Sequence, residues 1–119
     1  MKNTTIYLLL ILLIVGCAPK TMYYWGDYSN TLYKYKKDAT PEMLVKHKTE
    51  LLDIISKSNK KGFRIPPGIN AELGYIFLLQ EQYDQATVYL KKEKSTYPES
   101  TKFIDDLLQS LNGWDQNEN

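Results

Sequence analysis

The chain has a single cysteine and a single histidine among its 119 residues. One cysteine cannot form an internal disulfide, so the fold must depend on packing alone. The sequence also lacks a metal-ligand cluster, a glycine-rich phosphate loop and a spaced pair of nucleophile and base. His47 lies between Lys46 and Lys48, a position that we expect on a solvated helix face. We therefore expect no enzyme activity, cofactor, metal or small-molecule substrate.

An excess of one charge is lacking too. The 15 Lys and Arg residues and the 14 Asp and Glu residues leave a formal net charge of +1. A domain that binds nucleic acid normally has a strong basic excess, so this composition argues against a nucleic-acid partner. The length of 119 residues is that of one domain.

The longest apolar run is short: it covers the ten residues 6–15, IYLLLILLIV. A helix that spans a membrane needs about 20 apolar residues, so this run is too short to span one comfortably. It follows Lys2 and precedes the small residue Gly16, which is typical of a secretory signal peptide. A buried core helix is the alternative, but the run lacks amphipathic spacing. We expect residues 1–16 to be a cleaved signal peptide.

The only cysteine follows this run directly, in the sequence Ile14-Val15-Gly16-Cys17. These residues resemble the lipobox of bacterial lipoproteins. The resemblance implies cleavage between Gly16 and Cys17, a diacylglyceryl group on the Cys17 sulfur and an acyl group on the new amino terminus. A small buried core residue is the ordinary alternative for a lone cysteine. Ala18, in place of Asp, implies sorting to the outer membrane, where the protein would face the periplasm.

The rest of the chain shows helical spacing and no strand pattern. We expect residues 28–111 to form an all-α domain of about five helices. Thr40 and Pro41 predict a helix start, and Gly62 predicts the end of that helix. The expected helices cover residues 28–37, 41–61, 70–80, 82–94 and 101–111.

Two segments flank this domain. Residues 17–27 are expected to be a lipidated tether, whose aromatic side chains either dock on the domain or lie at the membrane surface. Residues 112–119 are expected to be a flexible tail that begins where Asn112 and Gly113 end the last helix. Lys57, Lys60 and Lys61 form a basic cluster at the expected end of a helix, where simple solvation is the ordinary interpretation and a phosphate or lipid-headgroup site is the alternative.

Residues 70–98 match the pattern of a tetratricopeptide repeat, a pair of antiparallel helices. The matching positions are Leu73, Gly74, Phe77, Ala86, Leu90 and Pro98. Asn70 departs from the usual Trp, and Glu93 departs from the usual small residue. Because one hairpin cannot bury its own face, we expect a short tetratricopeptide-like repeat domain in which the flanking helices complete the core. The residues expected to line its concave groove are Asn70, Glu72, Tyr75 and either Leu78 or Leu79.

Three segments carry a wider resemblance: YYWGDYSNTLYKYKKD, PPGINAELGYIFLLQEQYDQA and KKEKSTYPES. They resemble the small bacterial lipoproteins of domain-of-unknown-function family 4810, and the resemblance covers residues 17–111. In that family the gene often lies beside genes for a lipoprotein resembling the curli-secretion channel subunit and for another small envelope lipoprotein. The resemblance therefore implies a role in an envelope complex and says nothing about chemistry.

These observations predict a lipid-anchored, non-catalytic accessory or adaptor subunit of an outer-membrane export or assembly complex. The expected partners are the membrane, through acyl chains on Cys17, and envelope proteins such as the curli-secretion-channel-like lipoprotein. The alternative is a pilotin-like chaperone that targets a channel subunit to the outer membrane. A structural spacer without a specific partner is the third interpretation.

Overall fold

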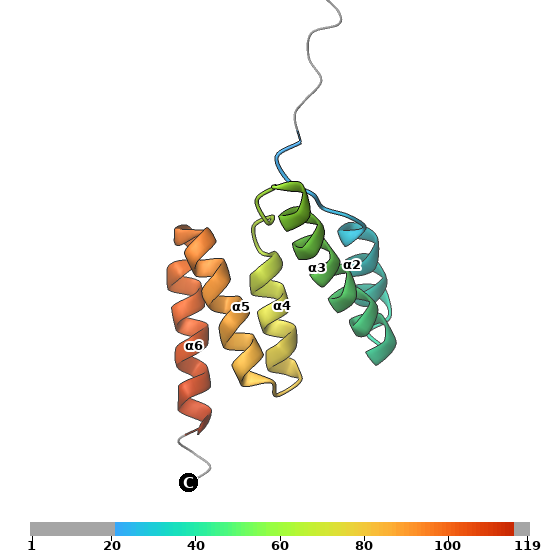
Figure 1. The fold of residues 1–119 in the computed structure, drawn as a ribbon. Coiled ribbons are helices and arrows are strands. Elements are labelled where there is room, and N and C mark those ends of the chain that lie inside the picture. The colour runs from blue at the N-terminus through green and yellow to red at the C-terminus, as the bar shows by residue number, and fades with distance from the viewer. Residues whose placement is uncertain (1–20, 116–119) are drawn as a thin grey trace, which may run out of the picture.

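The computed structural model describes the backbone of residues 21–115 and the side chains of residues 21–110. This part of the chain is all-helical, with five α-helices, one short 3-10 helix and no strand. Each α-helix runs antiparallel to the one before it (Figure 1). The elements are α2 (Tyr28–Lys37), α3 (Pro41–Lys61), α4 (Ile69–Leu79), α5 (Tyr83–Thr96), η1 (Pro98–Ser100) and α6 (Thr101–Asp115).

The ends of α3 follow directly from its sequence. The Thr40 hydroxyl accepts a hydrogen bond from the Met43 amide at 3.3 Å, and Pro41 occupies the first turn, where its missing N–H costs nothing. At the other end Gly62 takes a left-handed conformation with φ of 67°. Glycine adopts this conformation without a steric penalty, so it ends the helix. The predicted range of residues 41–61 is confirmed.

The end of α6 differs from the prediction. The helix continues through Asn112 and Gly113 to Asp115, although these two residues were expected to end it at residue 111. A glycine inside a helix costs about 1 kcal/mol relative to alanine, which is not enough to stop a helix on its own. Residues 116–119 of the expected tail lie outside the described part of the chain.

The hydrophobic core is centred on α4. Buried side chains from α3, α4 and α5 form one cluster, which explains why α4 is apolar almost all round. On α6, Ile104 is fully buried, whereas Phe103 is 63% exposed although it was expected on the same apolar stripe. The core cluster consists of Leu51, Ile54, Ile69, Leu73, Ile76, Phe77 and Ala86.

Helices α4 and α5 cross closely at Gly74. A Cβ atom added there would lie 2.8 Å from Leu90 Cγ and 3.2 Å from the Ala86 carbonyl oxygen. Beside this crossing, the Phe77 and Tyr89 rings stack with their centroids 5.4 Å apart. The hairpin therefore needs a residue without a side chain at position 74.

The segment before α2 packs against the helices. Tyr24 lies against the core cluster, and Trp25 contacts the Tyr28 ring at a centroid distance of 5.5 Å. The Asp27 amide donates a hydrogen bond to Glu50 of α3 at 2.6 Å. Of the two interpretations of the tether aromatics, docking on the domain holds for Tyr24, so the packed unit begins before residue 28.

Candidate functional site

His47 lies inside the domain, and the expectation that it is solvated is wrong: its side chain is 0% exposed. It shares one face of α3 with Leu51 and Ile54, four and seven residues further along, and both of these are fully buried. Helical spacing therefore directs His47 into the core, while Lys46 and Lys48 flank that face.

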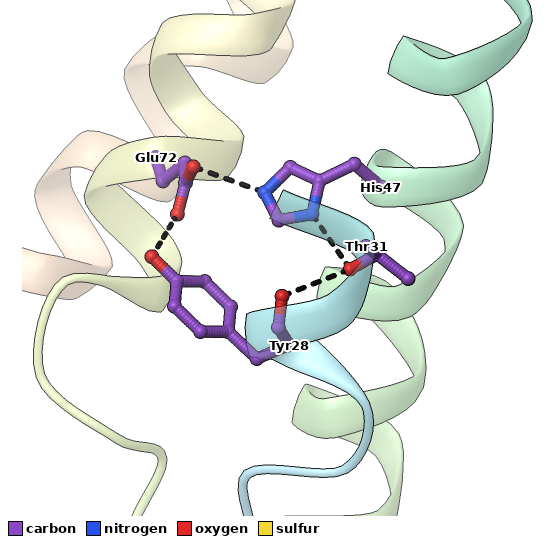
Figure 2. Close-up of polar contacts among 4 residues, drawn as sticks. All are labelled: Tyr28, Thr31, His47 and Glu72. Carbon is purple, nitrogen blue, oxygen red and sulfur yellow. Dashed lines mark hydrogen bonds and ion pairs between the residues drawn. The ribbon is translucent and has the colours of Figure 1, made fainter. Parts of the chain in front are cut away.

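His47 is part of a polar network that joins three helices (Figure 2). Its Nε2 atom lies 3.0 Å from Glu72 Oε1 on α4, and its Nδ1 atom lies 2.9 Å from the Thr31 hydroxyl on α2. The Tyr28 hydroxyl donates to the second carboxylate oxygen of Glu72 at 2.8 Å. Both carboxylate oxygens and both ring nitrogens therefore have partners, and α2, α3 and α4 are joined through side chains.

Two proton arrangements satisfy this network. In one, Thr31 donates to the Tyr28 carbonyl oxygen, which lies 3.1 Å away, and accepts from Nδ1–H of a cationic His47. In the other, Thr31 donates to Nδ1 of a neutral His47. In both, Nε2–H of His47 donates to Glu72, so a charged Glu72 fits either state.

The environment of Glu72 favours its charged form. Burial acts to raise the pKa of this carboxyl, but the hydrogen bonds from His47 and Tyr28 outweigh burial and hold the pKa below its usual value. The same contact acts in the opposite sense on the phenol: burial and the bond to Glu72 raise the pKa of Tyr28 to about 12. Near neutral pH the network therefore contains an ionised Glu72 and a neutral Tyr28.

The order of hydroxyl, imidazole and carboxylate is that of a hydrolase triad, but the imidazole is buried. A general base must come within hydrogen-bond reach of the proton that it removes from substrate. The His47 side chain is 0% exposed and both of its nitrogens are engaged, so no substrate atom can reach it in this conformation. The arrangement is suited to fixing helices in place. We call its four residues, Tyr28, Thr31, His47 and Glu72, the polar lock.

The expected groove residues do not share one surface. Asn70 is only 1% exposed, and Glu72 turns into the polar lock, so neither lines an open groove. The spacing of Asn70 with Leu73 and Phe77, three and seven residues on, could have indicated its burial. Leu78 packs partly against the core. Tyr75 and Leu79 remain on the surface, 51% and 53% exposed and one turn apart on α4.

The six repeat positions lie at or next to the α4–α5 hairpin. Leu73, Gly74, Phe77, Ala86 and Leu90 are all buried there. Pro98 begins η1, after α5 has ended at Thr96.

Glu93 has a role that sequence reasoning missed. It is only 2% exposed, and its Oε1 atom accepts a hydrogen bond from the Gly68 amide at 2.7 Å. Gly68 has no side chain to cap α4, so the carboxylate of α5 caps that helix from 25 residues away. The positive end of the α4 dipole also favours a carboxylate there. No local sequence signal reports a contact at this separation.

The predicted lipidation site, Cys17, and the cleavage position after Gly16 lie outside the described residues. Among the residues that are described, no helix is both long and apolar enough to cross a membrane. Residues 21–115 also hold no group of three or more His, Cys, Asp or Glu residues that could bind a metal ion.

Comparison with known protein families gives a match over most of the chain. A family model described as a domain of unknown function, DUF4810, matches residues 22–107. This span begins in the docked segment before α2 and ends within α6. No curated protein and no solved structure matches the chain.

Proposed function

The chain belongs to the DUF4810 family, and from its residues we propose that it is a lipid-anchored, non-catalytic accessory subunit of an outer-membrane export or assembly complex. One observation carries this proposal. The lipobox-like residues 14–17 end a signal-like apolar run, and only six residues lie between Cys17 and Tyr24, which packs on the domain. The sequence thus joins an attachment point directly to a folded module.

Lipid attachment at Cys17 would make membrane association permanent. Each buried methylene group contributes about 0.8 kcal/mol, so two or three long acyl chains hold a protein for far longer than one chain does. Ala18 supports sorting to the outer membrane. The module would then work at the membrane surface.

A tetratricopeptide-like character of the α4–α5 hairpin supports an adaptor role. The repeat spacing fits the close contact of Gly74 with Leu90, and modules of this kind present surfaces to partner proteins. Tyr75 and Leu79 are about half exposed on the helix that also forms the centre of the core. Exposed aromatic residues are enriched at protein interfaces. These two residues are therefore the proposed contact for the curli-secretion-channel-like lipoprotein.

The anchor is tested by replacing Cys17. The mass of the wild-type protein should correspond to a chain that starts at Cys17 and carries acyl groups, and the protein should fractionate with outer membranes. Cys17→Ala should remain unprocessed and lose both the acyl mass and the outer-membrane location. A wild-type mass without acyl groups would exclude the proposal.

The adaptor role is tested by co-purification from detergent-solubilised membranes. Tyr75→Ala combined with Leu79→Ala should reduce recovery of the channel-like lipoprotein. The matched control combines Tyr83→Ala with Val88→Ala, which are similarly exposed residues of α5. Equal loss in both double variants, or recovery of the wild type alone and monomeric, would contradict the proposed contact.

Deletion of the gene separates an accessory subunit from a pilotin. Loss of an accessory subunit leaves the channel protein in the outer membrane with impaired export. Loss of a pilotin leaves the channel protein mislocalised. Fractionation of the channel protein in the deletion strain therefore distinguishes the two roles.

A further inference from the structure

One end of the domain is basic. Residues 54–68 form the end of α3 and the connector to α4, and they contain four basic residues and no acidic one. Asp53 pairs with one of them, Lys57, at 2.8 Å. The side chains of all four are exposed: Lys57, Lys60, Lys61 and Arg64.

These basic residues adjoin the point where the chain enters the domain. Lys61 Nζ lies 4.5 Å from the centre of the Tyr24 ring. Arg64 lies over the Tyr97 ring, with its guanidinium carbon 4.5 Å from the ring centre. In Figure 1 the first described residues, drawn in blue, lie beside this end of α3. We call Lys60, Lys61 and Arg64 the anchor-side basic surface.

The last turns of α5 reach the same end of the domain. Tyr97 donates to the Ile65 carbonyl oxygen at 2.6 Å, which joins the chain just after α5 to the connector. Lys91 and Lys92 are exposed on these turns, whereas the nearby Glu93 is buried. Glu99 is the exposed carboxylate of η1. Basic side chains therefore predominate at this end.

The distance to the attachment point is short. Four residue steps separate Cys17 from Thr21, and an extended chain spans at most about 3.6 Å per residue, so this separation is at most about 14 Å. The field of an anionic membrane extends over a Debye length of about 8 Å at physiological salt. An acylated Cys17 would hold this end of the domain close to that field.

Exposed apolar side chains lie at the same end. Trp25 is 42% exposed and Met22 is 69% exposed, although the adjacent Tyr24 is packed against the domain. Tryptophan favours the interface between lipid and water, and basic side chains favour anionic headgroups. We propose that the anchor-side basic surface rests on anionic lipid headgroups, with Trp25 at the lipid–water interface. This inference depends on the proposed lipidation of Cys17, and it adds a fixed orientation to the anchor.

The test measures the depth of Trp25 in the lipidated full-length protein in vesicles. Trp114→Phe leaves Trp25 as the only tryptophan, so its fluorescence reports on this site alone. The probe is a lipid with a nitroxide on its headgroup, in vesicles of phosphatidylcholine with or without phosphatidylglycerol. Quenching should be stronger with phosphatidylglycerol and should weaken as salt rises from about 50 to about 500 mM at constant vesicle composition.

Two charge variants provide the matched comparison. Lys60→Gln, Lys61→Gln and Arg64→Gln together should lower the ratio of docked to undocked domain about 100-fold, because each basic residue near an anionic surface contributes about a factor of five. The control removes the same number of charges from the last turn of α2. It combines Lys34→Gln, Lys36→Gln and Lys37→Gln, and should retain the quenching.

The outcomes separate this inference from the proposed function. Failure of the wild type to float with vesicles of either composition would remove the anchor, and with it both proposals. Flotation with equal quenching in both vesicle types, or equal loss in both triple variants, would overturn the orientation and leave the anchor standing. Quenching that appears only when the channel-like lipoprotein is added would assign the surface to a protein partner and would also overturn it.

Discussion

Replacement of Glu72 by glutamine should weaken the fold through the polar lock. The substitution Glu72→Gln keeps the size of the side chain and removes its charge, and it leaves one acceptor oxygen in place of two. In the wild type, the Glu72 carboxylate accepts hydrogen bonds from both Tyr28 and His47, which lie on two different helices. The change therefore affects the joint between α4 and the α2–α3 pair without creating a cavity.

The expected loss of unfolding free energy in Glu72→Gln follows from the two hydrogen bonds. A bond to a charged group contributes about 1.5–3 kcal/mol and a bond between neutral groups about 1 kcal/mol, so loss of charge from two bonds should cost about 2 kcal/mol. For a domain of this size that cost corresponds to a fall in Tm of about 10 °C. Tyr28→Phe removes one bond to a charged group altogether, so it should cost a similar amount, about 1.5–3 kcal/mol.

Acid should remove the difference between the wild type and Glu72→Gln. The pKa of Glu72 is lowered in the folded protein, so its contribution to stability is complete above the unfolded pKa of about 4.3 and is lost as pH falls through the folded value. Thermal unfolding followed by circular dichroism at about pH 7 and at pH values below about 4 measures both effects. The two Tm values should converge as the pH falls.

Glu42→Gln is the control for loss of a carboxylate. Glu42 pairs with Lys46 at 2.8 Å, and its side chain is 70% exposed. Exposed pairs of this kind often contribute nothing measurable, so Tm should not change. If Glu72→Gln unfolds at the same temperature as Glu42→Gln, or if its deficit persists in acid, the argument for the polar lock is wrong.

Two further changes test other contacts, and a third tests the sorting of the protein. Gly74→Ala should destabilise the domain by about 1–2 kcal/mol in urea unfolding, since the crowding against the buried Leu90 exceeds the gain in helix propensity. If Leu90→Ala, added to the Gly74→Ala variant, does not offset the loss from Gly74→Ala, the close crossing is not its cause. Glu93→Ala should cost about 1–3 kcal/mol by the same measurement, because it leaves the Gly68 amide without its partner, and an unchanged midpoint would exclude the cap. Ala18→Asp should move the protein to the inner membrane in an enterobacterial host, which density-gradient fractionation would detect, and unchanged sorting would contradict the proposed role of Ala18.

Local signals predicted much of the fold. Thr40, Pro41 and Gly62 define α3 because capping depends on residues that are adjacent in sequence. The range of α2 was also correct, and α4 begins one residue earlier than expected. The α6 end was missed because tolerance of Gly113 inside a helix depends on more than its intrinsic preference.

The candidate site was harder to predict because its contacts join distant residues. His47 looked solvated between two lysines, yet its partners Thr31 and Glu72 lie 16 and 25 residues away. Its spacing from Leu51 was the available signal for burial. Glu93 appeared only as a departure from a repeat, since its contact with Gly68 exists only in the folded chain.

The two carboxylates that hold α4 have a consequence for how the protein opens. Glu93 of α5 accepts a hydrogen bond from the beginning of α4, and Glu72 in the first turn of α4 bonds to Tyr28 of α2 and His47 of α3. Neither α5 nor the α2–α3 pair can detach from α4 without breaking one of these contacts. Slow hydrogen exchange should therefore appear as one cooperative unit across α2 to α5, with few amides released by partial opening. A protein built in this way would present its partner with a rigid shape rather than a hinge.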